Sequence, residues 1–540
     1  MSKTLRGRLL AAIFCAGAAA ACAAPVRAET LADAIALAYE TNPNLLAQRA
    51  SQRALDETYV QARAGFRPTL SFTGEGSFTQ TRTPRRAGGG LIDTNGDGIP
   101  DAIGRGISNT NTGFFGLNFN QPIWTGGRVA AAVSAAEADI LSGRENLRRV
   151  EAQVMLSVIQ AYVDVRRDQQ SVQIRQQNVD VLTEQLKESK ARFDVGEITR
   201  TDVAQSESRL AAARALLSTA VAQLAISRAS YAAFVGQNPG ELAPEPSLAY
   251  LLPTNPDDAF AVAEKFSPLL RTQIYAEQAS RARVAEARAD RMPSVSLRAQ
   301  YGFAGNTRPF VPDRFSTDIN AQAVVSVPLF TGGLTSSRIR QQVERNNTDR
   351  INIETQRRSV LQTVTQAWNQ LISARANIDS TDEAVRAAQI AAQGTREERN
   401  VGLRTTLDIL NAEQELSNDE LAAAAARHDE YVGAATLLSA MGRLEAKDLI
   451  PAVTQYDARH NLRKLRFALG YVPWEEPIAI VDRALAVPPI PGPKETPAEP
   501  AIPPGLQPPP TPAIVAAGAP KAPAHAKRLH FGRKWSRLRH

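Results

Sequence analysis

The chain has 540 residues, of which 43% are hydrophobic, with two cysteines and a formal net charge of +7. Basic residues near the two ends account for this charge, so the body is slightly acidic and gives no argument for nucleic-acid binding. The sequence contains no phosphate-binding loop, no nucleophile elbow and no Cys/His metal cluster. We therefore expect a protein that is not an enzyme.

The first residues predict export. Basic residues precede an apolar run from Leu9 to Ala21, and Ala28 suits a cleavage site, so residues 1–28 are predicted to be a secretory signal peptide. Both cysteines lie in this segment, and Cys22 leaves lipid attachment open as an alternative. No later stretch reaches the roughly 18 apolar residues of a membrane-spanning helix, so membrane insertion would require a β-barrel.

The body of the chain repeats itself. Prolines near the start of each unit recur 225 positions apart, and later prolines, glycines and acids recur 206 positions apart. The clearest match joins Pro-Ile-Trp-Thr-Gly-Gly at 122–127 to Pro-Leu-Phe-Thr-Gly-Gly at 328–333. We interpret this pattern as a duplicated domain, with a first repeat at 29–250 and a second at 251–450.

In chain order, each repeat is predicted to contain a helix, a strand pair and two longer helices. The predicted helices are 30–64, 128–193 and 202–235 in the first repeat, and 256–290, 334–401 and 408–440 in the second. The predicted strands are 66–80, 112–123, 293–303 and 318–329, where apolar or small residues alternate with polar ones. A helix over 128–193 would span about 100 Å, which predicts a rod or a tube.

Four strands cannot close a barrel by themselves. Two chains would give eight strands around a filled interior, whereas three would give twelve and four would give sixteen. The alternation fits membrane strands, although the half-exposed sheet of a soluble protein would alternate in the same way. We therefore expect an oligomer, and a channel only from a trimer or a larger assembly.

The chain resembles the TolC family of outer-membrane efflux and secretion ducts over roughly residues 30–450. The likeness rests on 122–128, on 328–333 and above all on Asn-Val-Gly-Leu-Arg-Thr-Thr-Leu-Asp-Ile-Leu at 400–410. It implies a mainly α-helical homotrimer in the outer membrane of a Gram-negative bacterium, whose twelve-stranded barrel continues into a periplasmic tunnel of twelve helices. It also implies contact with outer-membrane lipid, a periplasmic adaptor protein and an inner-membrane pump of the RND or ABC class.

Two short motifs mark the predicted tips of the tunnel. Gly196 and Gly402 suit helix ends that need a positive φ, and a threonine three residues before Asp202 or Asp408 suits the start of the returning helix. The resemblance assigns Asp202, Arg404 and Asp408 to a periplasmic gate. In a trimer, three copies of each acid would approach one axis and favour cations.

Other positions depart from the family pattern or are structural. Arg399 stands where the family gate often has a tyrosine, and Asn411 replaces a second acid, so we expect one acidic ring rather than two.

The strand-helix corners are predicted to be structural, because proline lacks an N–H and glycine permits a sharp turn. They comprise Pro122, Gly126, Gly127, Pro328, Gly332 and Gly333.

A surplus segment at 88–106 follows part of a calcium-loop pattern. The candidate oxygen ligands are Asp93, Asn95, Asp97 and Asp101, although the closing glutamate is missing and such residues also form ordinary turns. No other cofactor is expected. A C-terminal periplasmic segment is predicted at 451–486, followed at 487–540 by a proline-rich and then basic disordered tail.

The leading hypothesis is an exit duct of a tripartite efflux pump or a type I secretion system. Such a duct would be gated at its helical tips and opened by the pump and its adaptor. A coiled-coil stalk on a small barrel and a constitutively open pore remain as alternatives. The sequence does not identify the transported substrate.

Overall fold

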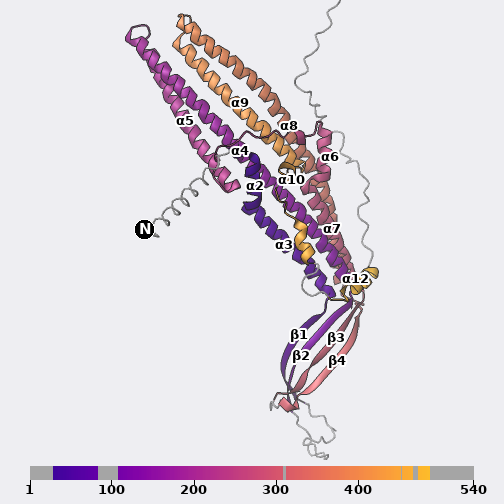
Figure 1. Ribbon diagram of the computed structural model, residues 1–540. Helices are drawn as coiled ribbons and strands as arrows, with labels where there is room; N and C mark the ends of the chain where they lie inside the picture. The colour runs from indigo at the N-terminus through magenta and orange to yellow at the C-terminus, as the bar shows by residue number, and fades with distance from the viewer. Residues whose placement is uncertain (1–27, 83–106, 308–311, 452, 466–471, 487–540) are drawn as a thin grey trace, which may run out of the picture.

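The computed structural model describes residues 28–82, 107–307, 312–451, 453–465 and 472–486. These residues form a long rod, with a four-stranded sheet at one end and the tips of two helical hairpins at the other (Figure 1). The predicted signal peptide, except for Ala28, and all of the candidate calcium loop at 88–106 and the tail at 487–540 lie outside the described residues.

The same order of elements occurs twice along the chain. The first series is α2 (Leu31–Thr41), α3 (Pro43–Arg63), η1 (Ala64–Phe66), β1 (Thr69–Arg82), β2 (Ile107–Trp124), α4 (Arg128–Asp194) and α5 (Arg200–Val235). The second is α6 (Pro256–Phe266), α7 (Pro268–Ala289), β3 (Ser294–Asn306), β4 (Ser316–Ser326), α8 (Leu334–Asn400) and α9 (Thr406–Ala440), with short 3-10 turns η2 (Ala249–Leu251) and η3 (Pro312–Arg314). Helices α10 (Ala446–Leu449), α11 (Ala458–Leu465) and α12 (Glu475–Ala484) follow.

The helix predicted at the start of each repeat is in fact two helices. Asn42 and Ser267 leave the helical conformation, and Pro43 and Pro268 begin the next helix at a position where no backbone N–H is needed. The Asn42 side chain accepts a hydrogen bond from the N–H of Asn44 at 3.0 Å. The prediction of unbroken helices over 30–64 and 256–290 was therefore wrong.

The sheet is fully antiparallel and has the order β1-β2-β3-β4, so β1 and β4 are its edges. β1 begins three residues later than predicted because residues 64–66 form a 3-10 turn. β2 was predicted at 112–123 but begins earlier, at Ile107, and continues to Trp124 through a register shift after Pro122, as proline allows at a bulge. β4 ends at Ser326, ahead of Pro328.

Most of the core lies partway along the rod, where the short helices surround α4, α8 and α9 (Figure 1). Tyr162 and Trp368 are among its largest fully buried side chains. A smaller cluster lies near the sheet and includes Tyr59 and Phe66. A third, around Leu410, lies towards the tips.

By length and composition, one helix of the described residues could cross a membrane. This helix is α5, contrary to the expectation that no membrane-spanning helix follows the predicted signal peptide. The signal is weak, because α5 is the returning arm of a hairpin and packs along α4. The helix therefore belongs to the helical rod.

Candidate functional site

Each hairpin tip is a short turn between two long helices. Gly196 and Gly402 have φ values of 79° and 83°, in the left-handed region that favours glycine. The next N–H closes each turn, from Glu197 to the Arg192 carbonyl and from Leu403 to the Glu398 carbonyl, both at 2.9 Å. The expected glycine turns are therefore present at both tips.

A capping box starts each returning helix. The Asp202 carboxylate accepts hydrogen bonds from the Thr199 hydroxyl at 2.8 Å and the Thr199 N–H at 2.9 Å. Asp408 accepts from the hydroxyl and the N–H of Thr405 at the same two distances. In both cases these hydrogen bonds lower the pKa of the carboxyl group. Both candidate gate acids are therefore ionised, and each stabilises its own helix.

Arg404 does not form an ion pair with Asp408 within the chain. Its Nε donates to Glu398 at 2.7 Å, and this hydrogen bond raises the pKa of the guanidinium. The positive charge of Arg404 makes only the smallest contribution to the lowered pKa of Asp408. The three candidate gate residues thus lie at the tips, but their contacts are local.

Two polar contacts that join the hairpins near their tips involve the positions that depart from the family pattern. Arg399, which is 8% exposed at the end of α8, donates to Glu188 of α4 at 2.7 Å. Arg209 of α5 donates to the side-chain oxygen of Asn411 in α9 at 3.0 Å. Both pairs link residues more than 200 positions apart, so no local sequence signal identified them.

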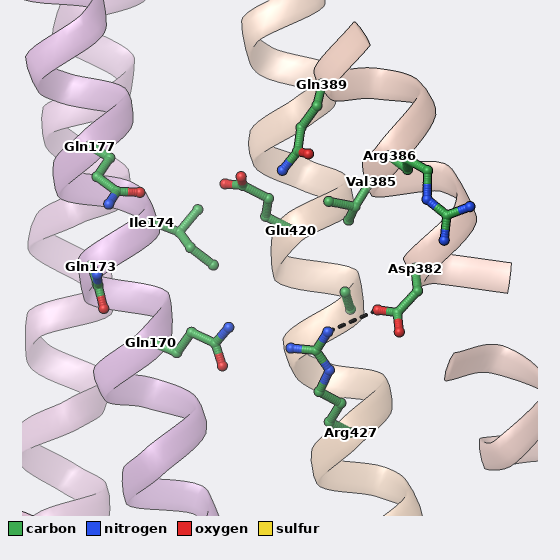
Figure 2. A pocket seen from close by; sticks show the side chains of 11 residues that line it. Gln170, Gln173, Ile174, Gln177, Asp382, Val385, Arg386, Gln389, Glu420 and Arg427 are labelled. Carbon is green, nitrogen blue, oxygen red and sulfur yellow. Dashed lines mark hydrogen bonds and ion pairs between the residues drawn. The ribbon is translucent and has the colours of Figure 1, made fainter. Parts of the chain in front are cut away.

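Away from the tips, a polar cavity of about 490 Å³ separates α4 from α8 and α9. Figure 2 shows glutamines of α4 on one side, and Glu420, Gln389 and the ion pair of Arg427 with Asp382 on the other. That pair is 2.9 Å apart, and burial raises the pKa of Glu420. The hairpins are thus joined near their tips and in the core, with a polar gap between these contacts.

The corner between β2 and α4 is held by helix α12. Asp482 of α12 is fully buried and accepts hydrogen bonds from the N–H groups of Thr125 at 2.8 Å, Gly127 at 3.1 Å and Ala130 at 3.3 Å. The Thr125 hydroxyl also donates to it, at 3.0 Å. Asp482 therefore caps the start of α4 from a distant part of the chain, a role that the sequence did not indicate.

The glycines at both corners have positive φ. The values are 69° and 86° at Gly126 and Gly127, and 60° and 85° at Gly332 and Gly333. Each pair ends directly before a 67-residue helix. The structure thus gives the physical reason for glycine in both Thr-Gly-Gly motifs.

Within the described residues, no group of three or more His, Cys, Asp or Glu side chains could hold a metal ion. The candidate calcium ligands lie in a segment outside these residues. The proposal of calcium there still rests on the sequence pattern alone.

His428 of α9 lies between two carboxylates. Its Nδ1 is 2.9 Å from Asp429 and its Nε2 is 2.9 Å from Asp164 of α4, with Arg167 nearby. Burial alone would lower the pKa of His428, and so would the positive charge of Arg167. The two carboxylates outweigh both and raise it. His428 therefore joins α9 to α4, and its two carboxylate partners favour the protonated imidazolium.

This arrangement predicts a pH-dependent stability. The contribution of His428 is complete below the ordinary histidine pKa near 6.5 and is lost as the pH rises through the raised folded-state value. We expect His428→Gln to lower stability by about 1 kcal/mol at pH 6 and by less at pH 9. Thermal denaturation of both proteins across this range measures the difference. A gap that widens with pH would contradict the assignment.

Comparison with known proteins agrees with the fold. The family model described as outer membrane efflux protein matches residues 34–237 and 262–443. The chain is 33% identical over 441 residues to outer membrane efflux protein BepC of Brucella suis, covering 81% of this chain and 91% of BepC. It is 24% identical to outer membrane protein TolC of Vibrio cholerae, covering 81% and 96% of the two chains.

Solved structures show the same architecture. The Campylobacter jejuni CmeC outer membrane channel superposes with a TM-score of 0.66 at 15% identity, over 81% of this chain and 89% of CmeC. The open-state MtrE outer membrane channel of Neisseria gonorrhoeae gives 0.63 at 19% identity, over 77% and 90%. Together with the two hairpins and the four-stranded sheet, these matches show that the chain belongs to the TolC family of outer membrane efflux proteins, which are channels of the Gram-negative outer membrane rather than enzymes.

Proposed function

We propose that three copies of the chain form an exit duct, with a twelve-stranded barrel in the outer membrane and a tunnel of twelve helices below it. The observation that carries this proposal is the four-stranded sheet with two unpaired edges, β1 and β4. In a membrane the free N–H and C=O groups of these edges need partners, which further copies can supply. The repeated order of elements supports an origin by internal duplication.

The helical tips are the proposed gate. Two cross-hairpin contacts, Arg399 with Glu188 and Arg209 with Asn411, hold α8–α9 against α4–α5. Breaking them would let the hairpins separate across the polar gap. In the trimer, the copies of Asp202 and Asp408 approach one axis, where their negative charge favours cations. An inner-membrane pump of the RND or ABC class, acting through a periplasmic adaptor, opens this gate for efflux or secretion.

Single-channel conductance of the purified oligomer in a planar bilayer tests the gate. We expect a low conductance for the wild type and a severalfold increase for Arg399→Ala, because this change breaks a contact between the hairpins. Arg192→Ala is the matched control. Arg192 pairs with Glu197 at 2.8 Å within one tip, so its loss leaves the hairpins joined and the conductance low.

Two further variants separate the roles of Asp408. Asp408→Ala removes both the charge and the helix cap, whereas Asp408→Asn keeps a side chain that can accept a hydrogen bond. We expect both variants to lower cation selectivity, and Asp408→Ala to raise the conductance more. A large conductance that no variant changes would indicate an open pore. No conductance from folded, inserted protein would favour the stalk.

A further inference from the structure

The two Thr-Gly-Gly corners have the same sequence but different surroundings. Thr125, Gly126 and Gly127 are buried, whereas the matching residues 331–333 are all exposed. Just before them, Leu329 is 93% exposed and Phe330 is 90% exposed. Two large apolar side chains thus lie uncovered beside three small residues, next to the free edge of β4.

Two segments cover the first corner. On one side is the turn that precedes β3, which lies so close that a Cβ added to Gly126 would collide with the Cβ of Met292 and lie 3.3 Å from the Ala289 carbonyl. On the other side is α12, through the hydrogen bonds of Asp482. The first corner therefore lies at the seam between β2 and the next strand, β3.

The turn before β1 matches the turn before β3. Ala64 and Arg67 lie 225 positions before Ala289 and Met292, the separation at which the prolines of the two units recur. Both turns are closed by the same hydrogen bond, from Arg67 N–H to the Ala64 carbonyl at 3.0 Å and from Met292 N–H to the Ala289 carbonyl at 2.9 Å. Residues 64–67 therefore form the same turn as the segment that covers the first corner. They precede β1, at the other free edge of the sheet.

Helix α12 extends this segment. Glu475 at its start accepts hydrogen bonds from Arg63 and, at 3.0 Å, from Arg67. Along α12, the side chains of Trp474, Val481 and Leu485 are exposed at helical spacing. Helix α12 therefore carries an apolar stripe, and the start of this helix contacts Arg67.

We propose that the second corner, residues 329–333, is a contact site for a second copy of this chain, formed by residues 64–67 and the apolar stripe of α12. Phe330 and Leu329 pack against this stripe when β4 of one copy pairs with β1 of the next. The proposal rests on the oligomeric duct and adds to it a specific interface. Its helical part lies outside the matched family region, which ends at residue 443.

Paired cysteines test this contact, since the natural cysteines occur only at positions 15 and 22. The double variant Phe330→Cys with Val481→Cys should form disulfide-linked dimers and trimers on a non-reducing denaturing gel. The matched control is Trp124→Cys with Val481→Cys, because Trp124 is the counterpart of Phe330 at the first corner and is half-buried. It should give no bond between chains.

A second measurement uses Phe330→Asp, which affects a side chain that the single chain leaves exposed. We expect at least a tenfold loss of trimer in size-exclusion chromatography with light scattering, whereas Leu403→Asp at a helical tip leaves the trimer intact. A trimer that conducts ions but neither cross-links nor responds to Phe330→Asp would overturn the contact and spare the duct. A wild type that stays monomeric would overturn both.

Discussion

Asp482→Ala is expected to lower the local stability of the start of α4 by about 3 kcal/mol or more. The alanine leaves buried N–H groups of Thr125, Gly127 and Ala130 without their acceptor, and each such group costs about 1 to 3 kcal/mol. It also removes a negative charge from the positive end of the α4 dipole. The expected result is local opening of the first corner.

Hydrogen exchange of a peptide that covers residues 121–135 measures this opening. A loss of 3 kcal/mol corresponds to exchange that is roughly 100-fold faster. Glu476→Ala is the matched control in the same helix, because Glu476 is 58% exposed and its ion pair with Arg63 lies at the surface. If both variants exchange at the wild-type rate, Asp482 does not hold the corner.

Gly126→Ala is expected to destabilise the chain by about 3 kcal/mol. A left-handed backbone costs an L-residue about 1 to 2 kcal/mol, and crowding in a packed region adds about 1 to 3 kcal/mol. The added Cβ collides with that of Met292, an atom that side-chain rotation cannot move. The repeat supplies the control, because a Cβ at Gly332 meets nothing within 4 Å.

Thermal denaturation of unassembled chains compares the two glycine variants. Gly332→Ala should lose only the free energy of placing an L-residue in the left-handed region. Its denaturation midpoint should therefore fall less than that of Gly126→Ala. Adding Met292→Gly to Gly126→Ala removes the colliding atom and should recover part of the loss. Equal losses for the two single variants would show that packing at the first corner contributes nothing.

The local features of the fold could be predicted from the sequence. The capping boxes need only a threonine and an acid three residues later, and the positive φ at Gly196 and Gly402 follows from turn chemistry. The breaks before Pro43 and Pro268 were not predicted, although these two prolines recur 225 positions apart. A proline ahead of an apolar run fits either a helix start or the interior of a loop.

The contacts that position the candidate gate could not be predicted from the sequence. Arg399 and Asn411 were treated as losses relative to the family pattern, but both bind across the hairpins. Asp482 lies in a segment with no recognisable motif, and its partners are 352 to 357 positions away. Side-chain pairs at such separation depend on how the helices pack, which periodicity does not specify.

The hydrogen bonds between Asp482 and the first corner also affect the order in which parts of the chain fold. A chain is synthesised from its N-terminus, so β1, β2 and the start of α4 are made long before α12. Because contacts so distant in sequence form late, we expect the first corner to gain this cap only after α12 has been made. A chain that ends before α12 would therefore lack the cap on α4 and, in the proposed assembly, the apolar stripe that contacts the neighbouring copy.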